Sequence, residues 1–334
     1  MTLVAEHTSA PPLLSVIVPS HNVWPWISET MQTILGQDLR DLEVIVVDDH
    51  STDGTREILA GFQSRDERVA VIDATEFGGA AARNLGLQHA SGRYLAFCDA
   101  DDLVPRGAYH ALVNSLEASG SEIAFGDFLK FSPTATWRPT SGWPAFAQPR
   151  VGFTLIEQPS IIRGRAVWNK VFRRDFWERV DIRFPESARS NDIVPMLTSY
   201  LAAQSFDLVD EIVYLYRERP GGSSMTSRAR SSVSLRAYLE QELSCAELVA
   251  GQGDHGVSSV FAGVFREADG WKHLAEHLSA PERESDDDLE IGRLLDEIIR
   301  RCLVSGSIGS AACGAPCSHS HAAATSPARR SSSW

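Results

Sequence analysis

The sequence contains no hydrophobic run long enough to cross a membrane as a helix. Its longest apolar stretches, such as residues 13–18 and 44–47, have the length of strands, whereas a spanning helix needs 18 or more apolar residues. The first twelve residues are largely polar and lack the apolar core of a signal peptide. These absences predict a cytoplasmic protein without a transmembrane segment. They leave peripheral association with the inner face of the cell membrane open.

Cysteine and positive charge are also scarce. The five cysteines among 334 residues are isolated or lie near the C-terminus, which is not the pattern of a disulfide framework. The formal net charge of -13 disfavours broad electrostatic binding of nucleic acid or of an anionic membrane. A polyphosphate substrate would therefore need a local group of cations or a bound metal.

The Gly-x-Gly-x-x-Gly loop of dinucleotide-binding sheets is missing as well. The first predicted strand leads instead into Pro19-Ser20-His21-Asn22. A dinucleotide oxidoreductase on a related sheet is disfavoured for that reason.

Strand-like and helix-like segments alternate along the first half of the chain. Apolar runs predict strands at residues 14–18, 42–47, 69–72, 93–98 and 122–125, separated by helices at 24–36, 79–89 and 103–116 and by one from Asp53 to residue 62. Two later strands, 168–172 and 206–216, flank a helix at 192–203. This order predicts an α/β fold with a mostly parallel sheet flanked by helices.

Polar residues follow four of these strands, at residues 19–22, 48–51, 73–79 and 99–102. In an open α/β sheet such loops lie at one edge, outside the carboxyl ends of the strands, where ligands bind. The sequence thus predicts a single polar site at that edge.

The rest of the chain differs in composition. Residues 133–159 are rich in Pro, Trp and Gly, and form either a mobile loop over the site or a poorly packed excursion. Residues 229–304 carry apolar stripes at helical spacing and predict a helical extension. Residues 1–12 are expected to be flexible, and the low-complexity residues 305–334 to be disordered.

The loop Asp99-Ala100-Asp101-Asp102 directly follows a predicted buried strand. Carboxylates suit Mg²⁺ or Mn²⁺, and such a cation can neutralise the charge that builds on a diphosphate leaving group. One or two protein carboxylates suffice, because phosphate and water complete the coordination. The alternative is a solvated acidic turn at the start of a helix.

Two further features point to the same ligand. A carboxylate in the loop Asp48-Asp49-His50-Ser51 would accept hydrogen bonds from a base or a ribose, although the loop is equally a helix start. Arg83, on the predicted helix 79–89, would either reach a donor phosphate or hold the loop at residues 99–102 through a salt bridge.

Four blocks occur in order at regular distances: residues 15–22 (SVIVPSHN), 46–55 (VVDDHSTDGT), 82–87 (ARNLGL) and 97–102 (FCDADD). Together they resemble the family 2 glycosyltransferases with the GT-A fold, over about residues 13–220. The resemblance implies a domain at residues 13–228, with a nucleotide-binding half at 13–128 and an acceptor half at 129–228. The Gln-x-x-Arg-Trp signature of processive synthases is absent, which favours transfer of a single sugar.

The resemblance implies a metal-dependent, inverting transfer from a nucleoside-diphosphate sugar, commonly UDP-linked, with Mn²⁺ or Mg²⁺ as cofactor. Asp49 would contact the base, Asp101 the ribose or the metal, and Asp102 the metal. The implied donor-binding set is completed by Pro19, Ser20, Asn22, Ser51 and Arg83.

Inversion also requires a base that takes the acceptor proton. The family supplies an Asp from a Glu-Asp pair after a Phe-Pro-Glu stretch, and here Phe184-Pro185-Glu186 precedes Asn191-Asp192. Asp192 is therefore the implied catalytic base. Asn191 replaces the family's Glu, so the like charge that would raise the pKa of Asp192 is missing.

The acceptor half carries two more candidates, Lys170 and Arg217, as phosphate or acceptor contacts or as members of surface ion pairs. Segments around residues 168–177, 184–192 and 214–226 look like the glycosyltransferase modules of actinobacterial teichoic-acid-type proteins. The implied acceptor is a cell-envelope glycan, a polyol-phosphate polymer or a lipid-linked sugar. A non-catalytic nucleotide-sugar-binding module, or the truncated remnant of a larger wall-polymer enzyme, is the alternative.

Overall fold

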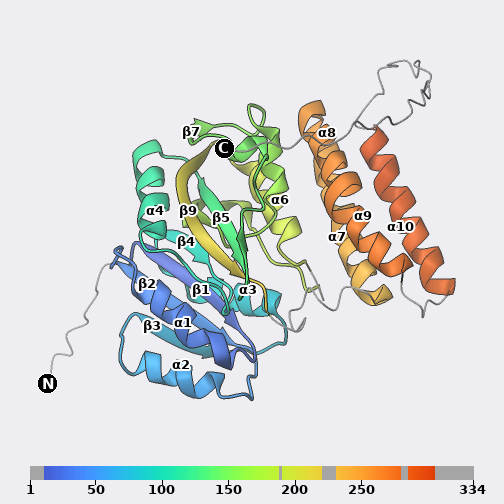
Figure 1. Cartoon of the computed structure of the whole chain (residues 1–334). Helices are drawn as coiled ribbons and strands as arrows, with labels where there is room; N and C mark the ends of the chain where they lie inside the picture. Colours follow the sequence, from blue (N-terminus) through green and yellow to red (C-terminus); the bar gives the residue numbers. More distant parts are fainter. Residues whose placement is uncertain (1–10, 188–189, 220–230, 280–284, 305–334) are drawn as a thin grey trace, which may run out of the picture.

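The computed structural model describes residues 11–187, 190–219, 231–279 and 285–304. In this part of the chain, one sheet lies between two layers of helices, and a further group of helices packs beside one of these layers (Figure 1). The expected tail at 305–334 and residues 1–10 of the expected flexible N-terminus lie outside the described residues.

The sheet has the strand order β3-β2-β1-β4-β8-β5-β9-β7, and the short β6 pairs with β5. The parallel part at one end comprises β1 (Leu14–Ser20), β2 (Leu42–Asp48), β3 (Val69–Asp73) and β4 (Tyr94–Phe97). The remaining strands are β5 (Ile123–Phe131), β6 (Thr136–Trp137), β7 (Arg150–Phe153), β8 (Lys170–Arg173) and β9 (Phe206–Arg217). β9 runs parallel to β5, whereas β7 and β8 are antiparallel to their neighbours. The expected mostly parallel α/β sheet is confirmed.

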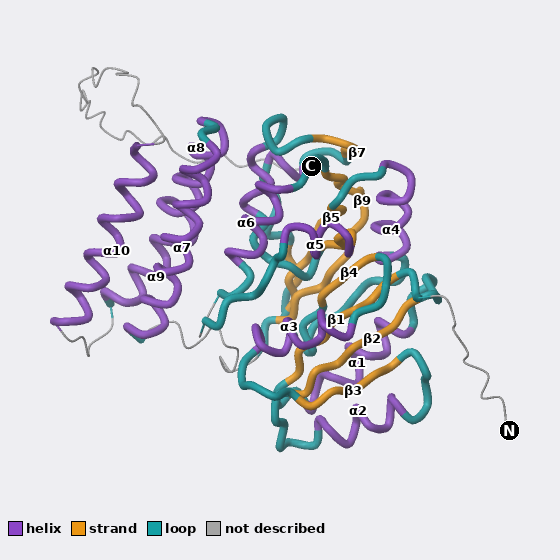
Figure 2. Tube along the Cα trace, turned by 180° about the vertical axis from the view of Figure 1, so that it is seen from behind, coloured by secondary structure: helices purple, strands orange, loops and turns teal. Residues whose placement is uncertain are grey.

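Helices cover both faces of this sheet, as the views from the two sides show (Figures 1 and 2). One face packs against α1 (Trp24–Leu35), α2 (Thr55–Gln63) and α4 (Ala108–Ser119). The other packs against α3 (Gly79–His89), α5 (Arg174–Val180) and α6 (Ile193–Ala202). Strands buried on both faces carry near-continuous hydrophobic runs, as residues 16–18 of β1 and 44–47 of β2 do.

The helices expected in residues 229–304 are present. They are α7 (Ser232–Gln252), α8 (His255–Gly263), the π-helical turn at Val264–Ala268, α9 (Asp269–Leu278) and α10 (Ser285–Val304). Side chains of α7, α8 and α10 share one hydrophobic core with the sheet, from Phe97 through Leu235 to Ile298. None of the described helices is long and apolar enough to span a bilayer.

Two predicted helix starts were wrong. The helix expected from residue 103 begins at Ala108, because Leu103 pairs with Leu215 of β9 and Gly107, at φ 87°, precedes the first turn. The helix expected from Asp53 begins at Thr55, since Gly54, with φ 96°, occupies the N-cap position. The Asp53 carboxylate still serves the helix start, by accepting a hydrogen bond from Thr55 N (3.1 Å).

The segment at residues 133–159 is packed on the sheet. It contains β6, a 3₁₀ turn at Pro144–Phe146, and β7, which pairs with β9. Phe146 and Phe153 are buried against the ring of Phe125 on β5. The poorly packed excursion was therefore the wrong alternative for this part of the segment.

Candidate active site

The four polar strand ends meet at one edge of the sheet. The β1–β2 register places Ser20 beside Asp48, and the β2–β3 register places Asp48 beside Asp73. Side chains then join the loops: Asn22 N donates to Ser51 Oγ (3.0 Å), and Asn22 Oδ1 accepts from the N–H of Thr52 (2.9 Å). Pro19, Ser20, Asn22 and Ser51, predicted from separate motifs, are thus brought together.

Two buried oxygen atoms at this edge lack a partner. Ser20 Oγ and Asp48 Oδ1 have no hydrogen bond within the described residues. Because buried polar atoms are nearly always satisfied by protein, water or ligand, this is a place where a polar ligand or water is needed.

Asp49, directly after β2, is joined to the residue that precedes α3. It is 7% exposed; its carboxylate accepts from Gly78 N (2.8 Å) and contacts His50 Nδ1 (3.0 Å). The His50 ring in turn stacks on the exposed ring of Phe77 at 4.2 Å between centroids. The carboxylate is thereby fixed at the mouth of the site.

Asp102 is held inside the protein. It is 1% exposed, its Oδ2 accepts from the Tyr214 hydroxyl (2.9 Å), and its Oδ1 accepts from Arg217 N (2.6 Å). Tyr214 is buried beneath Trp168, with ring centroids 4.3 Å apart. Both oxygens of Asp102 are therefore engaged in shaping the loop and in fastening it to β9.

Asp99 and Asp101 are nearer to solvent, and each is paired with an arginine. Asp99 Oδ1 accepts from Arg83 Nη2 (2.7 Å), and Asp101 Oδ2 accepts from Arg219 Nε. Burial raises the pKa of Asp101, and Arg219 opposes that rise. Burial, followed by repulsion from Asp101, raises the pKa of Asp102 further.

The surroundings of Asp101 and Asp102 indicate which of the two carboxylates is the better ligand for a divalent cation. Within the described ranges, no three His, Cys, Asp or Glu side chains form a ready metal-binding group. Asp102 would have to share oxygens that already accept hydrogen bonds, as described above. To bind a cation, Asp101 has to release only the hydrogen bond from Arg219. The guanidinium of Arg219 already places a positive charge beside Asp101, in the position that a cation would take. Oxygen ligands of this kind suit Mg²⁺ or Mn²⁺, so the loop fits the cation through Asp101 better than through Asp102.

Arg83 connects the loop at residues 99–102 to the predicted base. It is 8% exposed, and besides Asp99 it donates through Nη1 to Asn191 Oδ1 (3.0 Å). Asp192 follows at the start of α6, where its side chain makes no capping hydrogen bond. Burial raises the pKa of the Asp192 carboxyl, and the positive charge of Arg83 opposes that rise.

The two predicted contacts of the acceptor half lie in different surroundings. Lys170 is 1% exposed and donates to Ala166 O (2.5 Å) and Asn169 Oδ1 (2.7 Å), so the surface ion pair was the wrong alternative for this residue. Burial lowers the pKa of Lys170 to about 7. Arg217 lies at the site, where its guanidinium donates to Asp101 O (2.7 Å) and Glu29 Oε2 (2.7 Å).

The roles of Tyr214 and Arg219 were not predicted from the sequence. Tyr214 links Asp99 N (3.0 Å) to Asp102, while Arg219 pairs with Asp101 and lies 4.5 Å from the centroid of the Trp26 ring. The alternation Tyr214, Tyr216 on β9 was a usable signal, because alternate residues of a strand face the same side. Nothing local to Arg219 indicated its partner 118 residues away.

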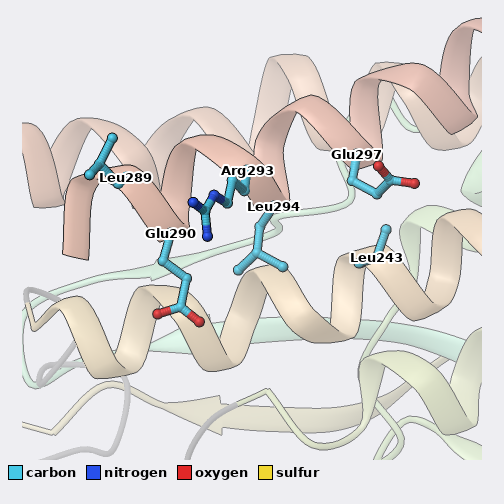
Figure 3. A pocket seen from close by; sticks show the side chains of 6 residues that line it. All are labelled: Leu243, Leu289, Glu290, Arg293, Leu294 and Glu297. Carbon is cyan, nitrogen blue, oxygen red and sulfur yellow. The ribbon is translucent and has the colours of Figure 1, made fainter. Parts of the chain in front are cut away.

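A separate hollow of about 680 Å³ lies in the helical extension (Figure 3). It is lined by α7 and α10, through Leu243, Leu289, Glu290, Arg293, Leu294 and Glu297. It contains none of the polar strand ends, and α10 is the outermost helix in Figure 1. We therefore place the active site at the sheet edge and not in this hollow.

Comparison with known proteins identifies relatives of this chain. The uncharacterized glycosyltransferase EpsJ of Bacillus subtilis is 33% identical over 63% of this chain and 62% of its own length. TarS of Staphylococcus aureus, named a poly(ribitol-phosphate) beta-N-acetylglucosaminyltransferase, is 26% identical over 64% of this chain and 37% of its own length. The chain thus matches less than two thirds of EpsJ and little more than a third of TarS.

The fold likeness extends further than these sequence matches. The crystal structure of S. aureus TarS 1–349 in complex with UDP-GlcNAc superposes with a TM-score of 0.72 at 21% identity, covering 87% of this chain and 81% of that chain. The expected GT-A fold is confirmed. Residues 15–212 match the family model described as glycosyl transferase family 2. The chain belongs to that family, which confirms the predicted class of enzyme.

Proposed function

We propose that the chain transfers one sugar from a UDP-sugar to a hydroxyl group of a polyol-phosphate wall polymer, with inversion at the anomeric carbon and with Mn²⁺ or Mg²⁺ as cofactor. Membership of the family supports the transfer. TarS was solved with UDP-GlcNAc, and relatives are named for poly(ribitol-phosphate), which supports the donor and the acceptor. A glycan or a lipid-linked acceptor would present the same hydroxyl chemistry.

The observation that carries the proposal is that Arg83 donates hydrogen bonds both to Asp99 and to Asn191, the residue before Asp192. One buried guanidinium thus holds the loop at residues 99–102 and the residue next to the proposed base. In the proposed reaction, Asp192 takes the proton of the acceptor hydroxyl while that oxygen bonds to the anomeric carbon. The bond from this carbon to the diphosphate breaks, and UDP leaves with the electron pair. A positioned base of this kind contributes roughly 10²–10⁴ in rate.

The remaining residues bind and orient the donor. Asp49 would accept hydrogen bonds from the base or ribose, and the Pro19–Asn22 loop would line the nucleotide pocket. Asp101 would hold the cation with support from Asp102. When bound, this cation would neutralise the charge that develops on the diphosphate. Arg217 and Arg219, both beside Asp101, would add positive charge at the same place.

A UDP-release assay tests the proposal. The native chain is incubated with UDP-GlcNAc, UDP-glucose and other UDP-sugars, with Mn²⁺ or EDTA, and with or without poly(ribitol phosphate). We expect release of UDP that needs the cation and increases with the acceptor, and NMR of the product should show the inverted anomer. Nucleotide binding without any turnover would instead favour a non-catalytic nucleotide-sugar-binding module.

A further inference from the structure

Residue 191 carries no charge, although it stands beside the proposed base. Asn191 is buried, and its Oδ1 accepts one hydrogen bond from Arg83 (3.0 Å). The same guanidinium pairs with Asp99 on its other side (2.7 Å). Arg83 therefore has one charged partner and one neutral partner, and its positive charge is shared with a single carboxylate in these contacts.

α3 holds the chain before Asp192 at a second point. Asn84 Nδ2 donates to Phe184 O (2.8 Å), and Asn84 Oδ1 accepts from Phe184 N (3.0 Å). The Arg83 guanidinium lies 5.5 Å from the centroid of the Phe184 ring. Two neighbouring residues of one helix thus fasten both ends of the segment that leads to the proposed base.

Three titratable groups, each from a different element, act on the pKa of Asp192: Arg83 on α3, Asp99 after β4 and Lys170 on β8. Asp192 in turn raises the pKa of Tyr200 on α6. Arg83 and Lys170 favour the ionised carboxylate, whereas Asp99 disfavours it. A carboxylate at position 191 would add its negative charge to that of Asp99, and would so disfavour the ionised form of Asp192 further. It would also pair with Arg83.

We propose that Asn191 is a positioning residue that gives Arg83 a neutral acceptor. One guanidinium then holds the residue before Asp192 next to Asp99, and its charge favours the ionised form of the base. The proposal rests on the proposed function, in which Asp192 takes the acceptor proton. It differs from the pattern that the sequence resembles, in which an acidic residue precedes the base.

The isosteric variant Asn191→Asp tests the charge. It keeps an acceptor of the same size but adds negative charge, so Asp192 is protonated more easily. We expect the acidic limb of kcat against pH, measured by UDP release with the donor that the native enzyme uses best, to move upward by roughly one pH unit. Above that limb the variant should regain near-native kcat, because the geometry is preserved.

The variant Asn191→Ala tests the position. It removes the acceptor, so we expect kcat to fall about tenfold to a hundredfold at every pH. The dissociation constant of UDP should stay within about twofold, because the nucleotide pocket is unchanged. A native pH profile for Asn191→Asp, or a native kcat for Asn191→Ala, would overturn the proposal.

A readout independent of turnover tests the link itself. Amide hydrogen exchange is compared in Arg83→Met and in the control Arg93→Met. Both arginines pair with a carboxylate and lie 5.5 Å from a ring centroid. Arg93, however, pairs with Glu117 on α4, away from the loop at residues 99–102. We expect faster exchange at residues 99–102 and 191–196 only in Arg83→Met. Unchanged exchange at 191–196 would overturn the link. Absence of turnover in the native chain would overturn the proposed function, while the exchange result would still decide the role of Arg83.

Discussion

Asp101 and Asp102 are neighbours in the sequence but lie in different surroundings. Asp102 is buried between Tyr214 and the backbone of Arg217, while Asp101 faces Arg219. The motif places two carboxylates at a strand end, and only the folded chain distinguishes them. At this scale the function depends on which oxygen atoms are already occupied.

The metal assignment predicts different results for these two residues. Asp101→Asn should abolish the part of UDP affinity that depends on Mn²⁺ and leave the thermal midpoint near the native value. Asp102→Asn should lower the thermal midpoint as well, because a buried amide cannot accept as the carboxylate does from Tyr214 and Arg217 N. Isothermal titration of UDP with and without EDTA measures the affinity, and thermal unfolding measures the midpoint. Mn²⁺-dependent UDP binding in Asp101→Asn would refute the assignment.

The proposed base gives a simpler test. Asp192→Asn should reduce kcat by at least about a hundredfold, because an amide cannot take the acceptor proton. UDP binding should persist, since Asp49 and Asp101 are untouched. If the variant transfers sugar at near the native rate, another group is the base.

Lys170 predicts a pH dependence of stability. Its folded pKa is lowered to about 7 by burial, so from about pH 7 to 10 the unfolded chain binds more protons at this residue. The penalty for burying Lys170 therefore shrinks as pH rises, and stability relative to Lys170→Met should increase by up to about 1.4 kcal/mol per pH unit. Urea unfolding of both proteins at pH 7, 8 and 9 measures this; a constant difference would contradict it.

Residue types and spacing were enough to predict the strand-end loops, because these depend on local pattern. The role of Asp192 is implied by the resemblance to the family and stays a prediction. Residue types and spacing were not enough for Arg219 or for the burial of Lys170. Those depend on contacts such as Arg219 with Asp101, whose partners are far apart in the sequence.

Among the helices and strands, α3 is the one that carries Arg83, which links Asp99 to Asn191. It lies against β1 and β2 and carries both Arg83 and Asn84. Its small residues permit this close approach: a Cβ at Gly86 would lie 2.6 Å from Ile17 Cγ2. The bounds of α3 were predicted correctly, since residues 79–89 are followed by a clear Ser-Gly break. The start of α4 was predicted too early, because Leu103 continues the apolar pattern of the helix but pairs with Leu215.

Gly86→Ala should lower the free energy of unfolding by roughly 1–3 kcal/mol, because the added methyl group pushes α3 away from β1. Gly292→Ala in α10 is the matched control: its Cβ meets nothing within 4 Å, so helix propensity alone should stabilise it by up to about 1 kcal/mol. Chemical denaturation compares the two. Equal effects of the two substitutions would show that α3 is not closely packed at Gly86.

On the scale of the whole molecule, the sheet and the helical extension are joined by an ion pair and by apolar packing. Arg165, before β8, donates two hydrogen bonds to Glu242 of α7, whose carboxylate is 0% exposed. The amphipathic stripe of α7 predicted a packing helix. Its partner was not predictable, because the stripe does not specify the surface that it covers.

Glu242→Gln should destabilise the protein by about 3 kcal/mol, since the buried guanidinium of Arg165 would lose the charge of this carboxylate. Glu247→Gln is the control, because Glu247 is exposed on the same helix and pairs with Arg301 (2.9 Å); its loss should cost less than about 1 kcal/mol. Thermal and denaturant unfolding measure both. Comparable losses would show that the Arg165–Glu242 pair has no special role.

The shared core has a practical consequence for dividing this protein. Phe97 beneath the active-site loop and Ile298 near the end of α10 belong to one apolar cluster. A gene fragment ending before residue 231 would retain every proposed catalytic residue but would expose the side of α6 that packs against α7 and would lack Glu242, the ion-pair partner of Arg165. Such a polypeptide is expected to aggregate on expression, so the catalytic half should be produced together with α7–α10.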